Sequence, residues 1–267
     1  MTTRILYLNK NATSPVGLPT SARFRLVAPG GIRLDADHVT IAAGKVDEFV
    51  NMVDGGLYGA NSNQDIATVV AVNGANVARF NPALAATPTG YTMGNFGFGG
   101  LNTGQYTMAG LWKVTDAFAG GKVRETIAAA YLTGTALTRA VLREDATGVP
   151  QGRAQRTGAD AATVVALTNP VRIGGWTAAA VTFDWTNNLV TIYDLLGAEV
   201  VSGTIAGTSG AAPTDISAYR LGYIATANND MFAGDLADYV HLPYVPTAPE
   251  LLALKMHMQA RANDLAS

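Results

Sequence analysis

The sequence contains no cysteine in its 267 residues, so no disulfide can stabilise it. Small secreted domains usually carry disulfides, and the absence favours folding in a reducing cytosol. Only 14% of the residues are charged and the net charge is −2, which argues against a nucleic-acid partner. No stretch approaches the 18 or so apolar residues of a membrane helix. The apolar run at 5–8 is too short for a signal-peptide core. We therefore expect neither a membrane partner nor general secretory export.

The chain does contain many short alternating segments, separated by clusters of Gly, Asn, Pro and Thr. This pattern is typical of β-sandwiches and barrels. The hairpin signals are clear at Asn73-Gly74, between two β-rich runs, and at 184–188. Residues 106–114 are predicted to form a central strand. The sequence thus predicts an all-β domain over residues 32–267.

Convincing helical signals occur only near the C-terminus. Thr247 and Glu250 form a capping box, with Pro249 in the first turn. Apolar residues then recur on one side of a helix predicted over 248–265; they are Leu251, Leu254, Met258 and Leu265. We expect this short C-terminal helix to seal the sandwich, with Leu251 and Leu254 buried.

Residues 1–31 form a different kind of segment. The segment contains Pro15, Pro19 and Pro29 and the pair Gly30-Gly31, which disfavour regular strand pairing. It also holds more apolar residues than a solvated tail needs. We therefore predict an N-terminal assembly arm that lies on a neighbouring subunit. Its contact residues are predicted to be Ile5, Tyr7, Leu8, Phe24 and Leu26.

Several segments together resemble one known family. They are Tyr219–Tyr223 with Phe232-Ala233-Gly234, the strand Tyr106–Lys113, the turn and strand Asn73–Phe80, and the strand pair in Trp176–Val201. In this order they resemble the concanavalin A-like lectins and glucanases, which include the laminin G-like domains. The resemblance implies a two-sheet antiparallel jelly-roll sandwich.

Catalytic and metal sites are not apparent in the sequence. Glucanases of this family use a Glu-x-Asp-x-x-Glu strand, and that spacing is absent here. The nearest acidic pairs, Asp47-Glu48 and Glu144-Asp145, are adjacent residues that point to opposite faces of a strand. The histidines at 38, 241 and 257 are scattered, whereas zinc needs converging ligands. We expect no enzyme, no metal site and no cofactor.

Calcium was weighed as well, because laminin G-like domains often bind it. The oxygen-rich segments 228–230 and 184–188 offer ligands. However, both are explained as turns that use Asn and Asp for their backbone geometry. No calcium position is assigned.

One aromatic residue suits sugar binding. Trp185 lies at a predicted hairpin tip beside Asn187 and Asn188, an aromatic and amide set suited to glycan contact. The alternative, which we favour, is that Trp185 packs over the sheet edge, because tryptophan is mostly buried. Trp112 and Trp176 are expected in the core.

The resemblance and the absences together lead to a functional expectation. A cysteine-free chain of this fold without an export signal looks most like a structural protein of a bacteriophage virion. It would be either a protein that decorates the capsid or a component associated with the tail. It would assemble with other virion proteins as a homo-oligomer through symmetric contacts. The alternative is an adhesin that binds a glycan on a bacterial surface. An intracellular hydrolase is a third possibility.

Overall fold

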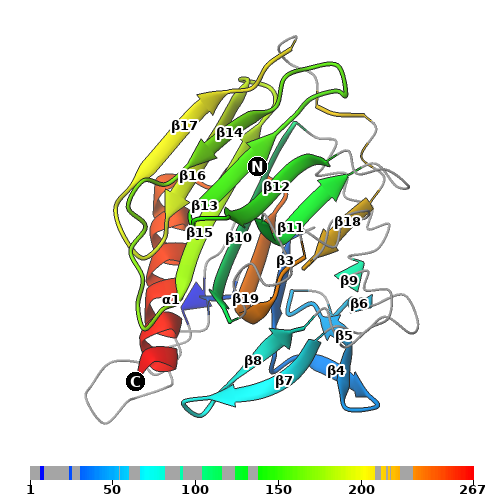
Figure 1. Ribbon diagram of the computed structural model, residues 1–267, viewed down its shortest axis with the longest axis vertical. Coiled ribbons are helices and arrows are strands. Elements are labelled where there is room, and N and C mark those ends of the chain that lie inside the picture. Colours follow the sequence, from blue (N-terminus) through cyan, green and yellow to red (C-terminus); the bar gives the residue numbers. More distant parts are fainter. Residues whose placement is uncertain are drawn as a thin grey trace.

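The computed structural model describes most of the chain as antiparallel sheets with one C-terminal helix (Figure 1). The described residues are 31–53, 55–59, 67–81, 104–115, 124–131, 138–207, 212–214, 216, 218–222 and 231–267, with the short strands at 7–8, 24–25 and 91–92. The predicted jelly-roll sandwich is confirmed: two large sheets lie one over the other, with helix α1 alongside the first.

The first sheet has the strand order β17-β16-β15-β10-β19-β8-β7, and β3 also pairs with β19. Its strands are β3 (Ile32–Asp35), β7 (Ala67–Val72), β8 (Ala75–Phe80), β10 (Gln105–Val114), β15 (Thr177–Asp184), β16 (Leu189–Asp194), β17 (Val200–Thr204) and β19 (Gly234–Leu242). All of these pairings are antiparallel.

The second sheet has the order β14-β13-β12-β11-β18-β9. Its strands are β9 (Tyr91–Thr92), β11 (Arg124–Tyr131), β12 (Thr138–Asp145), β13 (Pro150–Ala154), β14 (Thr163–Ala166) and β18 (Ala218–Leu221). A smaller sheet contains β4 (Val39–Ala42), β5 (Lys45–Val50) and β6 (Leu57–Gly59).

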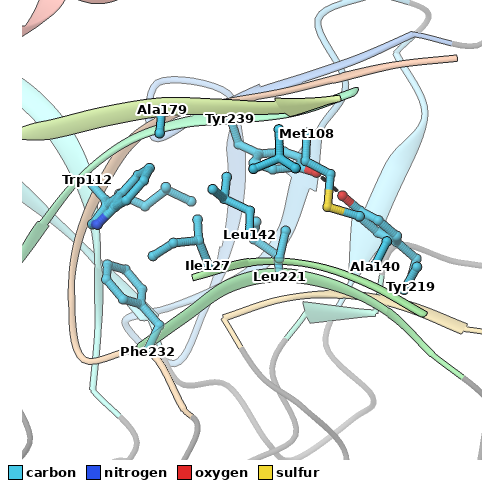
Figure 2. Close-up of a cluster of buried hydrophobic side chains, with 14 of the residues drawn as sticks. Met108, Trp112, Ile127, Ala140, Leu142, Ala179, Tyr219, Leu221, Phe232 and Tyr239 are labelled. Carbon is cyan, nitrogen blue, oxygen red and sulfur yellow. Dashed lines mark hydrogen bonds between the residues drawn. The ribbon is translucent and has the colours of Figure 1, made fainter. Parts of the chain in front are cut away.

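The main hydrophobic core fills the space between the two large sheets (Figure 2). Side chains alternate between the faces of a strand, so every second residue of each sheet points into this space. The first sheet contributes Met108, Trp112, Ala179 and Tyr239, and the second contributes Ile127, Ala140, Leu142, Tyr219 and Leu221. Trp112 and Trp176 are both buried, as the sequence predicted.

Helix α1 (Ala248–Ala266) begins at the predicted capping box: Thr247 N–H donates to the Glu250 carboxylate at 2.8 Å. Its buried residues are Leu254, Met258, Ala262 and Leu265. They pack on the outer face of the first sheet, against residues such as Leu111, Ala180 and Val240. The helix therefore covers one sheet from outside and does not close the gap between the sheets. Leu251 is half-buried, so the prediction that Leu251 and Leu254 are both buried holds only for Leu254.

The predicted hairpins are confirmed. Asn73 and Gly74 have φ of 49° and 80°, the left-handed geometry that a tight turn between β7 and β8 requires. Gly222 has φ of 79°, and a Cβ there would lie 2.5 Å from Phe80. Position 222 therefore requires glycine for two reasons: the positive φ disfavours other residues, and a side chain would collide with Phe80.

Only part of the predicted arm lies within the described residues. Strands β1 (Tyr7–Leu8) and β2 (Phe24–Arg25) pair with one another, and β2 contacts α1 of the same chain. Ile5 and Leu26 lie outside the described residues. The role of the arm in assembly stays a prediction.

Candidate functional site: the arginine face of the second sheet

The outer face of the second sheet carries most of the polar side chains that its strands contribute. Ala140 and Leu142 of β12 point into the core, so their neighbours Arg139, Val141 and Arg143 point outward. The same alternation applies to β13, where Ala154 is in the core and Arg153 faces out.

We call this surface the arginine face. It consists of Arg139, Arg143, Gln151, Arg153, Gln155 and Arg220. Strand register fixes their arrangement: Val141 is opposite Arg153, and Ala129 is opposite both Val141 and Arg220. Two small residues, Ala129 and Val141, therefore lie between the arginines of β13 and β18, where they form a separate buried cluster.

The first part of the arginine face is a hydrogen-bonded row. Arg143 donates from Nε and Nη2 to the Gln151 side-chain oxygen at 3.1 and 3.0 Å. Gln151 in turn donates to Asp145 at 2.8 Å. Burial would raise the pKa of Asp145, but hydrogen bonds from Thr147 and Val149, together with the charge of Arg143, lower it. The row therefore keeps Asp145 ionised and Gln151 oriented.

The second part surrounds Arg153. Its Nη1 donates to the Thr138 carbonyl at 2.9 Å and to the Thr138 hydroxyl at 2.5 Å, and its Nη2 donates to Gln155 at 2.6 Å. Across the sheet, the Arg220 guanidinium lies 5.3 Å from the centre of the Tyr131 ring. These contacts fix two guanidinium groups in position, which reduces the entropy that binding would cost.

Exposure divides this surface. Arg139 and Arg143 are 2% and 7% exposed, whereas Gln151, Arg153 and Arg220 are half-buried. Val164 on β14 lies opposite Arg153 and is 46% exposed. The partly accessible side chains are thus two fixed guanidinium groups, those of Arg153 and Arg220, the amide of Gln151 and the apolar side chain of Val164.

Arginines predominate among the charged side chains that the described strand positions place on the arginine face: Arg139, Arg143, Arg153 and Arg220 point outward, together with the carboxylate of Asp145. Guanidinium groups bind carboxylates in a planar, two-bond geometry, and amides bind hydroxyl groups. The arrangement can hold a ligand that carries both hydroxyl and carboxylate groups.

Trp185, Asn187 and Asn188, the candidate glycan residues, are placed as the favoured packing alternative predicts and not as a sugar-stacking site requires. Trp185 is completely buried, with its ring 6.1 Å from that of Phe183 and beneath the Arg156 guanidinium. Asn188 accepts a hydrogen bond from Arg156 at 2.5 Å, and Asn187 donates to Asp184 at 2.7 Å. The exposed ring that sugar stacking requires is therefore absent, because the aromatic core draws Trp185 inward. At the tip of the β15–β16 hairpin, Trp185 therefore packs against the protein and is not available to stack on a sugar.

The sequence analysis did not identify the pair of carboxyl groups formed by Glu125 and Glu144. Glu125 of β11 lies directly opposite Glu144 of β12. Glu144 and Asp145 do point to opposite faces, as predicted, but the partner of Glu144 comes from the neighbouring strand. Their separation of 19 positions carries no sequence signal, since only strand register brings them together.

The histidines considered in the sequence have separate environments. His38 Nδ1 lies 2.6 Å from Asp35 within one turn, and His257 of α1 contacts Asp238 of β19. His241 is buried in the core, and burial lowers its pKa to about 3. Within the described ranges, no group of three or more His, Asp or Glu side chains is arranged to hold a metal ion. Segment 228–230 lies outside the described residues.

Comparison with known proteins gives a fold and no family. No family model matches the sequence, and no curated protein matches it. Among solved structures, a sialidase of Trypanosoma rangeli in complex with the inhibitor DANA is similar, with a TM-score of 0.55 and 13% identity over 84% of this chain and 32% of that chain. A mutant of that sialidase displaying trans-sialidase activity gives a TM-score of 0.57 and 11% identity over 88% and 34% of the two chains.

The receptor binding domain of botulinum neurotoxin type G is also similar, with a TM-score of 0.53 and 9% identity over 84% of this chain and 50% of that chain. The chain thus spans about a third of the length of the sialidases and half of the neurotoxin domain. At these identities the likeness shows the fold alone, which defines the chain as a two-sheet antiparallel β-sandwich.

The comparisons correct one expectation and leave others untested. Our exclusion of an enzyme is contradicted, because the sandwich is similar to sialidases, and we withdraw it. That exclusion rested on the missing carboxylate pair, whereas the fold brings Glu125 and Glu144 together. Nothing in the comparisons supports a bacteriophage origin. The virion role and location and the homo-oligomer stay predictions. Within the described part of the chain, no helix is long and apolar enough to cross a membrane.

Proposed function

We propose that this chain is a glycan-binding module that holds carboxylate-bearing sugars on the arginine face. The observation that carries the proposal is the concentration of Arg139, Arg143, Arg153 and Arg220 on one sheet face, together with the carboxylate of Asp145. Such a concentration of one sign of charge attracts anionic ligands.

The chemistry of the accessible residues supports a sugar ligand. Arg153 supplies charge-assisted hydrogen bonds, which are roughly twice as strong as neutral ones. Gln151 offers an amide to sugar hydroxyls, and the exposed Val164 offers an apolar surface to ring C–H groups. The likeness of the sandwich to glycan-processing proteins agrees with this reading but assigns no ligand.

Binding is tested with the full chain by calorimetry and on a glycan array. The probes are sialyllactose and an oligogalacturonate as carboxylated sugars, with lactose and a carboxyl-reduced oligomer as neutral controls. We expect binding of at least one carboxylated probe and at least tenfold weaker binding of its neutral counterpart. The affinity of the carboxylated probe should fall as salt is added.

Variants locate the site. Arg153→Gln and Arg220→Gln should each weaken binding about tenfold or more, since a hydrogen bond to a charged group contributes about 1.5–3 kcal/mol. Lys45→Gln removes a cation from β5, in another sheet, and should leave the affinity unchanged. Equal loss in all three variants, or no binding of any acidic sugar, would contradict the proposal.

A further inference from the structure

An arginine side chain lies inside the sandwich, away from the arginine face. The strand pattern continues for one residue past β13, since the Gln155 N–H donates to the Arg139 carbonyl at 2.9 Å. Side chains alternate along it, so Arg156 shares the inward side of the core residue Ala154. Arg156 is 4% exposed. Because a guanidinium group does not lose its proton in proteins, a permanent positive charge is held in the interior.

The hydrogen bonds of Arg156 go to neutral groups. Its Nη2 donates to the Trp185 carbonyl at 3.2 Å and to the Asn188 side-chain oxygen at 2.5 Å. Both acceptors lie at the tip of the β15–β16 hairpin of the first sheet. The guanidinium carbon lies 5.7 Å from the centre of the Trp185 ring, which adds a cation–π attraction. These contacts connect the two sheets, but none of them supplies a negative charge.

Several buried donors meet at this place without an acceptor. Nε and Nη1 of Arg156 have no hydrogen-bond partner, and neither have Nε1 of Trp185 and the hydroxyl group of Tyr106. The rings of Tyr106 and Trp185 lie 6.4 Å apart. Burial raises the pKa of Tyr106, against a smaller lowering effect of Trp185, so the hydroxyl group keeps the hydrogen that it can donate. Buried polar groups are almost always hydrogen-bonded, so four such donors on three neighbouring side chains point to a bound ligand.

The carboxylates on the adjoining segments are engaged elsewhere. Asp184, at the end of β15, accepts from the backbone N–H and the side-chain amide of Asn187 at 3.0 and 2.7 Å. Asp160 accepts from the Thr157 hydroxyl at 2.7 Å. Within the described part of the chain, neither carboxylate forms an ion pair with Arg156, whose contacts are those with Trp185 and Asn188.

The chemistry of the donors defines the ligand. A buried cation disfavours the folded state strongly unless an opposite charge lies beside it. Each buried donor without an acceptor disfavours it further. The free donors of Arg156, Trp185 and Tyr106 therefore require a group that accepts hydrogen bonds, and Arg156 requires that this group be negatively charged. Water meets the first requirement only, because it is neutral.

We propose that Arg156 binds a small monovalent anion, of the size of chloride, between the two sheets beside Trp185 and Tyr106. The anion accepts hydrogen bonds from Arg156 and neutralises its charge. Because Arg156 follows β13 of the second sheet and Trp185 belongs to the β15–β16 hairpin of the first, the anion stabilises the contact between the sheets. The next residues along the chain, Thr157 and Thr186, are exposed, so the site lies directly beneath the surface and exchanges its anion with solvent.

Chloride dependence of stability tests the site with the full chain at pH 7. Urea unfolding is measured at constant ionic strength while sodium chloride replaces sodium methanesulfonate, whose anion is larger. An anion bound only by the folded chain lowers the unfolding equilibrium constant by the factor 1 + [anion]/Kd. That constant should therefore fall about elevenfold at a chloride concentration of about ten times Kd. Equal unfolding curves in the two salts would overturn the proposal and would indicate water at these donors.

Two arginine variants separate this site from the arginine face. Arg156→Met removes the charge and keeps a long apolar side chain, and its unfolding curves should coincide in the two salts. Arg153→Gln, three residues earlier and on the outer face, should retain the full chloride effect while it weakens the proposed sugar binding. A chloride effect of the same size in Arg156→Met and in the wild type would contradict the proposal.

A measurement on the wild type covers the case in which Arg156→Met does not fold. Bromide replaces chloride in most anion sites and scatters X-rays anomalously. Crystals of the wild type soaked in sodium bromide should therefore show an anomalous peak beside the Arg156 guanidinium. Bromide bound at the molecular surface alone would refute the site.

Discussion

His257 of helix α1 lies 2.5 Å from the Asp238 carboxylate of β19, which it approaches through Nε2. Arg33 of β3 donates to the same oxygen at 3.2 Å. The three side chains are almost completely buried and join the helix to two neighbouring strands of the first sheet. Burial would raise the pKa of Asp238, but attraction to Arg33 and His257 outweighs it and lowers the pKa to about 2.

Asp238→Asn is expected to destabilise the fold by about 3–5 kcal/mol, because it leaves Arg33 buried without its carboxylate. The stabilisation is present above the ordinary aspartate pKa of about 3.9 and is lost as the pH falls toward about 2. Urea unfolding at pH 7 and pH 2.5 measures both effects. Asp264→Asn, at an exposed position of α1, should change stability by less than about 0.5 kcal/mol. Equal small effects of the two substitutions would refute this role for Asp238.

Leu254→Ala should cost about 2–5 kcal/mol, because Leu254 is 1% exposed and packs between α1 and the first sheet. Leu252 lies two residues earlier on the same helix and is 58% exposed. Leu252→Ala should therefore be nearly neutral, and the pair forms a matched test of helix docking by thermal unfolding. Similar melting temperatures for both variants would show that the helix is not held by this face.

Trp185→Ala should lower stability by about 3–5 kcal/mol, because it removes a buried aromatic side chain from the cluster with Tyr106 and Phe183. Calorimetric unfolding measures the loss. Asn187→Ala, at an exposed turn position, provides the surface control. A stable Trp185→Ala variant that no longer binds glycans would restore the idea of a stacking residue at this tip.

Gly222→Ala and Gly74→Ala separate backbone strain from crowding. Both glycines have φ near 80°, so alanine costs about 1–2 kcal/mol of strain at each. Gly74 has open space around it, whereas a methyl group at Gly222 would collide with Phe80. Gly222→Ala should therefore cost about 1–3 kcal/mol more than Gly74→Ala in chemical unfolding. Equal costs would show that Phe80 moves freely aside.

Much of the fold was predictable because its signals are local. The turn at Asn73-Gly74 and the capping box at Thr247 and Glu250 each depend on a few adjacent residues, and both are confirmed. The strand predicted at 106–114 is confirmed as β10, Gln105–Val114. The two-sheet sandwich followed from the order of several such segments.

The sites required tertiary structure. Glu125 meets Glu144, and Arg153 and Arg220 share a face, because strand register aligns them across the second sheet. Register depends on which strands become neighbours, and the alternation within one strand carries no record of it. Trp185 is a similar case: the sequence places it at a hairpin tip, but packing against the rings of Tyr106 and Phe183 buries it. The sequence by itself determined the strands, turns and helix from short-range chemistry, whereas burial and cross-strand partners were decided by long-range packing.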